Sequence, residues 1–250
     1  MFHGKMKAVT FSYDDGVTQD QRLIAILNKY GLKATFNLNS GLLGTANALV
    51  RDGVTVAHCK PQPGEIRKIY EGHEIASHTL THPMLPELDD REVIRQVEGD
   101  RLRLSELAGY EVVGFAYPGG GVNYDHRVAD VIRRSTGVRY CRTTVSSHDF
   151  APQTDLYEFR PTVFHLMEGD RMRALGERFV ALETDTPALF YIWGHAYEFD
   201  VGDRWQEFED FCRFISGRDD IFYGTNKAVL LGLYLNNHKR RAAICPRRAV

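Results

Sequence analysis

Short apolar runs alternate along the chain with longer segments in which apolar residues recur at helical spacing. This pattern predicts strands at 7–13, 33–38, 74–77, 112–116, 138–142, 188–193 and 220–223. It predicts helices at 19–30, 63–70, 89–108, 125–134, 170–183, 203–215 and 226–235. Between the second strand and the second helix, residues 40–62 contain three glycines and one proline and are expected to form a loop.

The repeated alternation of strand and helix indicates parallel strands joined by right-handed crossovers, which is an α/β fold. Six or seven such units favour a barrel, complete or incomplete, over an open sheet. The chain shows no internal repeat, low-complexity tract or linker. We therefore expect residues 1–250 to form a single domain.

Composition changes this picture little. Apolar residues make up 43% of the chain and charged residues 26%, which are ordinary values for a globular domain. The formal net charge of −2 gives no electrostatic argument for binding nucleic acid. No apolar run approaches the ~18 residues of a membrane span, and the N-terminus lacks the apolar segment of a signal peptide. A cytoplasmic protein without a membrane span is expected.

Two clusters of polar residues suggest a metal site. Asp14 and Asp15 follow the first strand, and adjacent carboxylates are costly inside a fold unless they bind a cation or hydrogen-bond donors. A simple Asp-Gly turn is the alternative. His78 and His82 stand four residues apart, a spacing at which a helical turn directs both rings to one side. Imidazole and carboxylate together suit zinc and several other divalent ions.

A third cluster, Trp193-Gly194-His195, places His195 at the close of a late apolar strand. A histidine there is either a general acid near neutral pH or a core histidine whose ring nitrogens are satisfied by neighbours. In α/β barrels the active site lies at the carboxyl ends of the strands. The acidic pair, His78 and His195 all follow strands, so they are expected on one face of the barrel.

The motifs of this chain, in their order, resemble those of the polysaccharide deacetylase family of chitooligosaccharide-deacetylase type. They are F-S-Y-D-D-G at 11–16, H-T-L-T-H-P at 78–83, F-A-Y-P-G-G at 115–120 and W-G-H at 193–195. The resemblance spans residues 7–195. It implies a distorted (β/α) barrel with seven or eight parallel strands and a metal-dependent amide hydrolase.

The resemblance also implies roles for individual residues. Asp14 matches the catalytic base, and His195 matches the histidine that protonates the leaving amine. Asp15, His78 and His82 match the ligands of one divalent metal ion. Zinc is the expected ion, with cobalt, manganese, nickel and iron as alternatives.

Contacts to the substrate follow from the same comparison. The backbone N–H of Gly119 matches the donor to the oxyanion. Further residues expected to line the substrate site are Tyr117, Asn37, Trp193 and His165. Five other histidines are expected to be structural: His3, His58, His73, His126 and His238.

Two features depart from the family pattern. The family often has an arginine that orients the base in its third motif, and this chain has Ala116 there. The acid that tunes the catalytic histidine cannot be singled out from the sequence. The candidates are Asp149, Asp155, Glu198 and Asp200, with the last two ranked first because they lie close to His195.

The expected function is hydrolysis of a non-peptide carbon–nitrogen amide bond, foremost N-deacetylation of an N-acetylated sugar or glycoconjugate. Two alternatives stay open. One is a hydrolase of a small non-sugar amide, and the other is a catalytically silent carbohydrate-binding relative, which the missing arginine motivates. The expected partner is therefore a carbohydrate or a small amide, and the sequence leaves the oligomeric state open.

Overall fold

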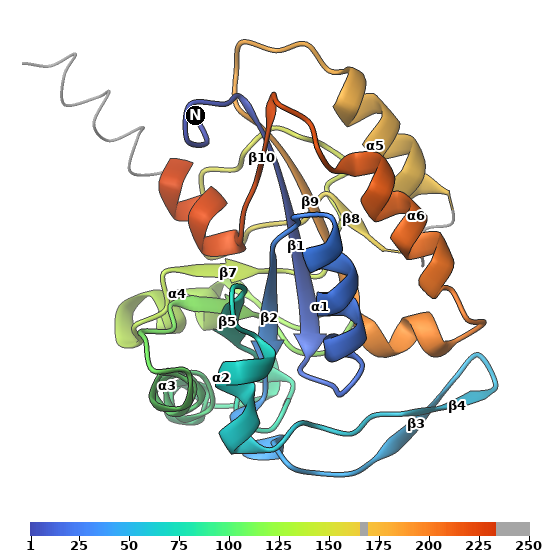
Figure 1. Ribbon diagram of the computed structural model, residues 1–250. Helices are drawn as coiled ribbons and strands as arrows, with labels where there is room; N and C mark the ends of the chain where they lie inside the picture. The colour runs from blue at the N-terminus through green and yellow to red at the C-terminus, as the bar shows by residue number, and fades with distance from the viewer. Residues whose placement is uncertain (166–169, 234–250) are drawn as a thin grey trace, which may run out of the picture.

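The computed structural model describes residues 1–165 and 170–233 and is built around an eight-stranded sheet (Figure 1). The sheet order is β7-β6-β5-β2-β1-β9-β8, with β10 also paired to β1, and every pairing is parallel. The strands are β1 Lys7–Asp15, β2 Ala34–Leu38, β5 Glu74–Ser77, β6 Gly114–Ala116, β7 Tyr140–Arg142, β8 Val163–Phe164, β9 Ala188–His195 and β10 Ile221–Tyr223.

The stretch between β7 and β8 connects the two ends of the sheet. Next to β7, Thr143 N donates to Phe159 O at 2.9 Å, and next to β9, Thr162 N donates to Tyr191 O at 2.8 Å. This irregular stretch therefore bridges the strands at the two ends. The expected distorted (β/α) barrel of parallel strands is confirmed.

Helices surround the sheet on its outer side (Figure 1). They are α1 Asp20–Lys29, α2 Ile66–Ile69, α3 Asp90–Ala108, α4 His126–Ser135, α5 Arg171–Ala181 and α6 Trp205–Ile215. A last helix, at 226–233, packs on the opposite face of β1, where Asn226 contacts Thr10 and Val229 joins the apolar cluster of Ala8. Four 3-10 helices are η1 Ser40–Leu42, η2 Pro63–Glu65, η3 Leu85–Glu87 and η4 Ala196–Asp200. Residues 234–235 of the predicted last helix lie outside the described residues. Within the described ranges, no helix combines the length and apolar character needed to cross a membrane.

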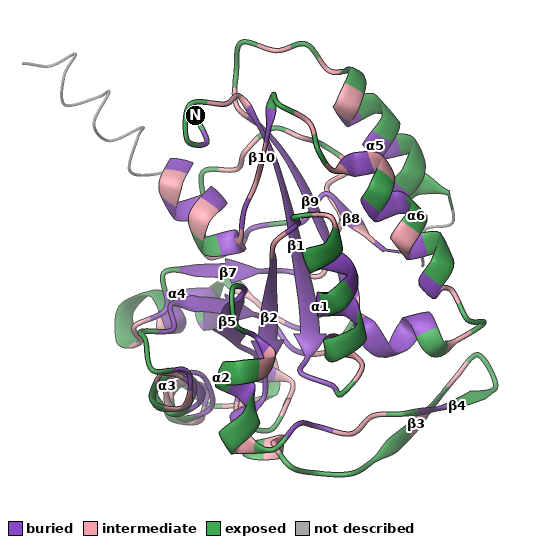
Figure 2. Ribbon diagram, in the orientation of Figure 1, coloured by how far each residue is buried: buried purple, intermediate pink, exposed green. Residues whose placement is uncertain are grey.

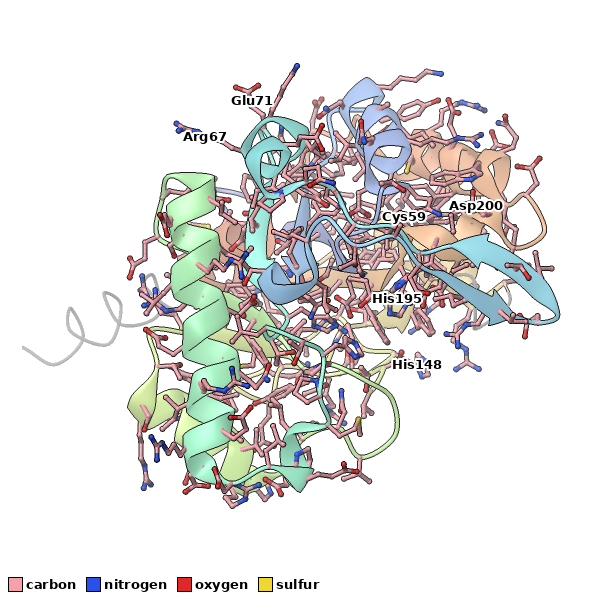
Figure 3. All side chains as sticks on the ribbon, turned by 90° about the horizontal axis from the view of Figure 1, so that it is seen from below. Cys59, Arg67, Glu71, His148, His195 and Asp200 are labelled. Atoms are coloured by element: carbon pink, nitrogen blue, oxygen red, sulfur yellow. The ribbon has the colours of Figure 1, made fainter. Side chains whose placement is uncertain are left out.

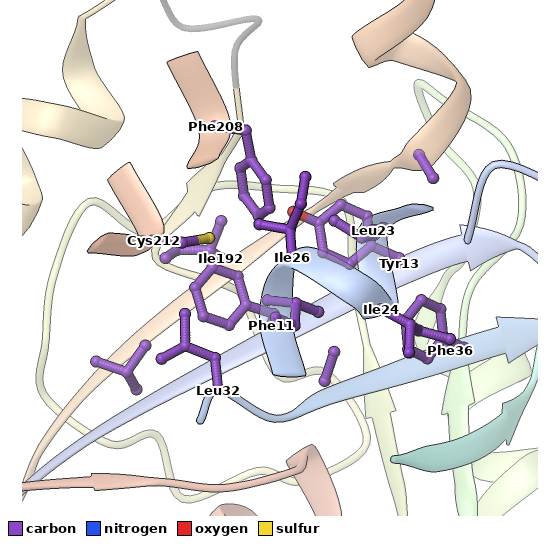
Figure 4. Close-up of a cluster of buried hydrophobic side chains, with 14 of the residues drawn as sticks. Phe11, Tyr13, Leu23, Ile24, Ile26, Leu32, Phe36, Ile192, Phe208 and Cys212 are labelled. Atoms are coloured by element: carbon purple, nitrogen blue, oxygen red, sulfur yellow. The ribbon is translucent and has the colours of Figure 1, made fainter. Parts of the chain in front are cut away.

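All nine residues of β1 are buried, and they alternate between two environments (Figure 2). Phe11 and Tyr13 belong to the largest apolar cluster, where they meet residues such as Leu23 and Phe208 (Figure 4). Ser12 and Asp14, on the opposite face, make polar contacts with Asn37 instead. Because side chains alternate along a strand, one face of β1 packs against the helices while the other carries polar groups.

The expected loop at 40–62 is wrong in its central part, which forms a β-hairpin. Strands β3 Ala48–Arg51 and β4 Val54–Ala57 pair antiparallel and extend from the body of the molecule (Figure 1). At the tip, Asp52 and Gly53 have φ angles of 49° and 77°. Asp-Gly between two β-rich runs is a strong hairpin signal, since a tight two-residue turn needs positive φ at both positions.

Candidate active site

The first polar group of the site lies at the carboxyl ends of three neighbouring strands. Asp14 is the register partner of Asn37 on β2 and of His195 on β9. Figure 3 views the molecule from the side on which these strands end, and labels His195 there. The hydrogen-bond ladder of the sheet therefore places three of the predicted residues side by side.

Both oxygens of Asp14 are held by neighbours. Asn37 Nδ2 donates to Asp14 Oδ1 at 2.8 Å, and Arg142 Nη2 donates to Asp14 Oδ2. Asp14 is 1% exposed and Arg142 is fully buried, so the two charges compensate each other away from water. Asn37 was expected against the substrate, but its amide holds the carboxylate.

Sequence reasoning missed Arg142. It ends β7 as the register partner of Ala116 on β6, the position where the family's arginine is absent. Residues in register on adjacent parallel strands project to the same face. The Arg142 guanidinium therefore reaches Asp14 from β7, one strand beyond the β6 position at which the family has its arginine. The indole of Trp193 lies 4.3 Å from the Arg142 guanidinium carbon, which makes Trp193 a packing surface for the arginine. A charged residue ending a short buried strand is the signal that could have revealed it.

Asp15, His78 and His82 lie close enough together to hold a metal ion. Each offers a ligand atom, and the three atoms lie within 4.8 Å of one another. Asp15 Oδ1 lies 3.9 Å from His78 Nε2 and 3.6 Å from His82 Nε2. His78 Nδ1 lies 2.8 Å from the carbonyl oxygen of Ala116, to which only a protonated nitrogen can donate. The Nε2 lone pair of neutral His78 therefore faces Asp15, as metal binding requires.

The charge states of His78 and Asp15 also suit metal binding. Burial lowers the pKa of His78 to about 4, so the ring is neutral near pH 7. Burial would raise the pKa of Asp15, but a hydrogen bond from His58 and the charge of Lys60 lower it well below its ordinary value. One carboxylate and two imidazoles form a donor set that fits a divalent ion.

The two histidines converge for a reason other than the expected one. Residues 78–82 form an irregular loop and not a helical turn, with φ angles of 71° at Thr79 and 61° at His82. The loop is held by His82 N, which donates to Thr79 Oγ1 at 3.0 Å, and by Asn39 Nδ2, which donates to Thr79 O at 3.0 Å. The two rings lie close together as the spacing predicted, with centroids 5.0 Å apart, but the helical turn expected to direct them is wrong.

His58 was expected to be structural, but it lies at the site. Its Nε2 is 3.1 Å from Asp15 Oδ2, the carboxylate oxygen on the far side from the other two histidines. Lys60 Nζ donates to the backbone oxygen of Asp15 at 2.6 Å. Both residues follow β4, so the hairpin that the sequence did not predict supplies polar contacts to Asp15. His73 does match the structural expectation, since its Nδ1 accepts from Ala34 N at 3.1 Å.

Asp100 of α3 fixes the backbone at Ser77 and His78, where the first candidate metal-ligating histidine begins its loop. It accepts from Ser77 Oγ at 2.6 Å, from Ser40 N at 2.7 Å and from His78 N at 3.1 Å. Burial raises the pKa of Asp100 to about 7. Sequence reasoning assigned it no role, because a single acidic residue inside an amphipathic helix carries no signal of its own.

Glu198, one of the four candidate acids, lies beside His195. Its Oε2 is 3.3 Å from His195 Nδ1 and 2.7 Å from His165 Nε2. Burial would lower the pKa of His195, but the negative charge of Glu198 raises it to about 9, so the ring is cationic near pH 7. The other candidates have other partners: Asp149 turns back on its local backbone, Asp155 pairs with Arg133, and Asp200 accepts from Trp205 Nε1.

Gly194 is required by the close packing of His165. A Cβ atom at position 194 would overlap the His165 ring, which lies against the backbone there. His165 is fully buried, and burial lowers its pKa, so it is a neutral neighbour of Glu198. His165 thus contacts the same Glu198 oxygen that His195 contacts.

The third motif divides into a loop and a core residue. Gly119 has a φ of 81°, and Asn123 Nδ2 donates to the carbonyl oxygens of Gly119 and Tyr117 at 3.1 and 3.2 Å. The Tyr117 side chain is fully buried, and its hydroxyl donates to Tyr157 O at 2.9 Å. Tyr117 therefore packs in the core, and the expectation that its side chain lines the substrate site does not hold.

The sequence places the chain in a family. The family model described as polysaccharide deacetylase matches residues 3–140, so the chain belongs to the polysaccharide deacetylase family. A curated relative is the peptidoglycan-N-acetylmuramic acid deacetylase PdaC of Bacillus subtilis (strain 168), 27% identical over 124 residues. This match covers 48% of the chain but only 23% of the length of that relative.

Solved structures share the fold at low sequence identity. The Bc1960 peptidoglycan N-acetylglucosamine deacetylase has a TM-score of 0.53 at 15% identity, covering 92% of this chain and 90% of its own. The Xyl-CE4 domain of a multidomain xylanase from the hindgut metagenome of Trinervitermes trinervoides has the same score and identity, with coverage of 93% and 91%. Peptidoglycan deacetylase PdaC from Bacillus subtilis has a TM-score of 0.50 at 17% identity, with 98% of both chains covered.

Proposed function

We propose that this chain is a metal-dependent hydrolase that removes the acetyl group from an N-acetylated sugar. The single observation that carries the proposal is the placement of Asp14. It lies 3.9 Å from His78 on the side of the candidate metal ligands, and it is the register partner of His195 on the other side. A base, a metal site and an acid therefore surround one point at the ends of the strands.

Asp14 acts as the base in this proposal. Arg142 and Asn37 fix the carboxylate, and a carboxylate in a fixed orientation can accept a proton from an attacking water. A divalent ion held by Asp15, His78 and His82 would lower the pKa of water and stabilise negative charge on the amide oxygen. Arg142 takes the orienting part that the missing arginine at position 116 would have taken.

His195 acts as the acid. With its pKa raised to about 9, it carries a proton near pH 7 that it can give to the leaving amine. Glu198 stabilises the cationic ring before the transfer. The N–H of Gly119 is proposed to donate to the oxyanion, in a loop whose backbone Asn123 holds in place.

Acetate release tests the proposal. The purified protein, with and without metal stripped by a chelator, is incubated with small N-acetylated glycosides and N-acetylglucosamine oligomers. Activity is expected only with metal, and Asp14→Asn is expected to lower kcat by about 100-fold or more, because it removes the base. Asp219→Asn makes the same chemical change at an exposed carboxylate and serves as the control. Equal activity of wild type and Asp14→Asn would overturn the proposal.

The non-sugar alternative is separated by offering the protein small formyl amides and primary amides in parallel. Release of formate or ammonia from these, with no acetate from the sugars, would indicate a non-sugar amide as substrate. The alternative of a catalytically silent carbohydrate-binding protein rested on the missing arginine at position 116. Because Arg142 contacts Asp14 instead, this reason for the alternative no longer applies. Cytoplasmic location stays a prediction, so the substrate is defined by its N-acetyl group and not by its compartment.

A further inference from the structure

The β3–β4 hairpin is fixed against the element that carries Glu198. Val56 of the hairpin is 4% exposed within the main apolar cluster. The His58 ring lies 5.1 Å from the Tyr197 ring on η4, and the Tyr197 ring lies 5.1 Å from the His195 ring. The base of the hairpin therefore stands one ring away from the proposed acid, and its side chains are held at the edge of the site.

Arg51 is the outermost group in a line of contacts that starts at His195. Its Nη2 lies 3.3 Å from Glu198 Oε1, while the other Glu198 oxygen serves the two histidines. The Arg51 side chain is 42% exposed and that of Glu198 only 4%. Solvent, and hence a substrate, reaches this line of contacts most readily at the guanidinium.

The exposed end of this line carries a permanent positive charge. Arg51 is cationic at any pH of interest and its side chain is partly open to solvent, while the Glu198 carboxylate that it contacts is buried and also contacts His165 and His195. The charge of Arg51 therefore lies where it can attract an anion.

The guanidinium also has donors to offer. It has five N–H groups in a planar fork, which matches a carboxylate or phosphate. Among the described residues, its one hydrogen bond runs from Nη2 to Glu198. Nε is unpartnered but buried, so the two Nη groups are the donors that can serve an anion. An anion arriving from solvent would find the exposed part of the fork ready to donate.

We propose that Arg51 binds an acidic substituent of the substrate, so that the site favours N-acetylated sugars that also carry a carboxylate or a phosphate. This proposal rests on the proposed deacetylase function. It makes the hairpin a specificity element whose arginine recognises charge at the edge of the catalytic face.

A purely structural role for Arg51, tying the hairpin to η4, makes a different prediction. Such a tie would affect all substrates alike, whereas anion recognition affects only the ratio between acidic and neutral substrates. Partly exposed ion pairs contribute little to stability, so loss of Arg51 is expected to leave the chain folded. The ratio of kcat/KM values is therefore the quantity to measure.

The test compares three glycosides with one aglycone: N-acetylglucosamine, its 6-phosphate and N-acetylmuramic acid. We expect the wild-type protein to favour at least one of the acids about tenfold in kcat/KM, as a charge-assisted hydrogen bond would give. Arg51→Gln is expected to bring that ratio close to one. Arg103→Gln makes the same charge change at an exposed position on α3 and is expected to keep the wild-type ratio. Added salt should lower the wild-type preference.

The outcomes separate the two proposals. Acetate release without preference in the wild-type protein, or a preference that survives in Arg51→Gln, overturns the role of Arg51 and leaves the deacetylase function standing. No acetate from any of the glycosides, nor from N-acetylglucosamine oligomers, overturns the deacetylase function itself. If Arg51→Gln does not fold, Arg51→Lys keeps the charge without the fork and is expected to give an intermediate ratio.

Discussion

The strand ends and the β3–β4 hairpin contribute to the site in different ways. Asp14, Asn37 and His195 are held in register by the parallel sheet, and the first two are only 1% exposed. Arg51 and His58 come from a hairpin, and their side chains are 42% and 17% exposed. The residues proposed to transfer protons lie on the strands of the sheet. The residues that contact Glu198 and Asp15 from the solvent side lie on or directly after the hairpin.

This difference follows from how each part is stabilised. A residue on a central strand cannot move without breaking the ladder on both sides of it. A two-stranded hairpin is marginally stable alone and depends on the contacts made at its base. Changes on the strands should therefore affect chemistry and stability together, while changes on the hairpin should affect affinity and selectivity.

The largest effect is expected from Arg142→Ala. It leaves the Asp14 charge buried without its partner, which should lower the free energy of unfolding by about 3–5 kcal/mol. Acetate release should fall by about 100-fold, because the base is no longer oriented. Thermal unfolding and steady-state kinetics measure the two losses. Unchanged kinetics would mean that Arg142 is only a structural partner of Asp14.

A second-site change sharpens this result. Ala116 is the register partner of Arg142, so Ala116→Arg in the Arg142→Ala background puts a guanidinium on the neighbouring strand. About tenfold of the lost activity is expected to return, as a charged hydrogen bond to Asp14 is restored. A double variant no more active than Arg142→Ala would show that the two positions are not interchangeable.

An intermediate effect is expected from Glu198→Gln. Glu198 raises the pKa of His195 to about 9, and the acid form of His195 is the one that donates. Activity should therefore fall as the pH rises through this pKa. Without the negative charge the His195 pKa drops, and the alkaline limb of the kcat profile should move to lower pH. An alkaline limb at the same pH in both proteins would remove His195 as the acid.

The smallest effect is expected from His58→Ala on the hairpin. Its ring nitrogen lies 3.1 Å from Asp15 Oδ2 and orients a candidate metal ligand from outside. Loss of such a contact should weaken metal binding by about tenfold with little change in stability. Competition with a chromogenic chelator measures the affinity directly, and His126→Ala, at an exposed ring, is the control. If the wild-type protein and both variants bind the metal ion with equal affinity, His58 makes no contribution to the metal site.

The sequence predicted the parts of the site that carry local signals. Asp14, Asp15 and His195 each end a strand with a strong apolar pattern, so their common face followed from the fold class. Arg142 escaped, because its link to Asp14 spans 128 residues and depends on the register of β6 against β7. His58 escaped for a related reason: the hairpin that positions it was read as a loop.

The packing of His165 against Gly194 has a consequence for reading related sequences. The smallest side chain at position 194 would already collide with the ring, so the two positions can change only together. In a relative with alanine between this tryptophan and histidine, the residue equivalent to His165 must be a different one or its ring must lie elsewhere. The middle letter of W-G-H thus reports on a residue twenty-nine positions earlier, and shows whether the proposed acid still has its neutral neighbour.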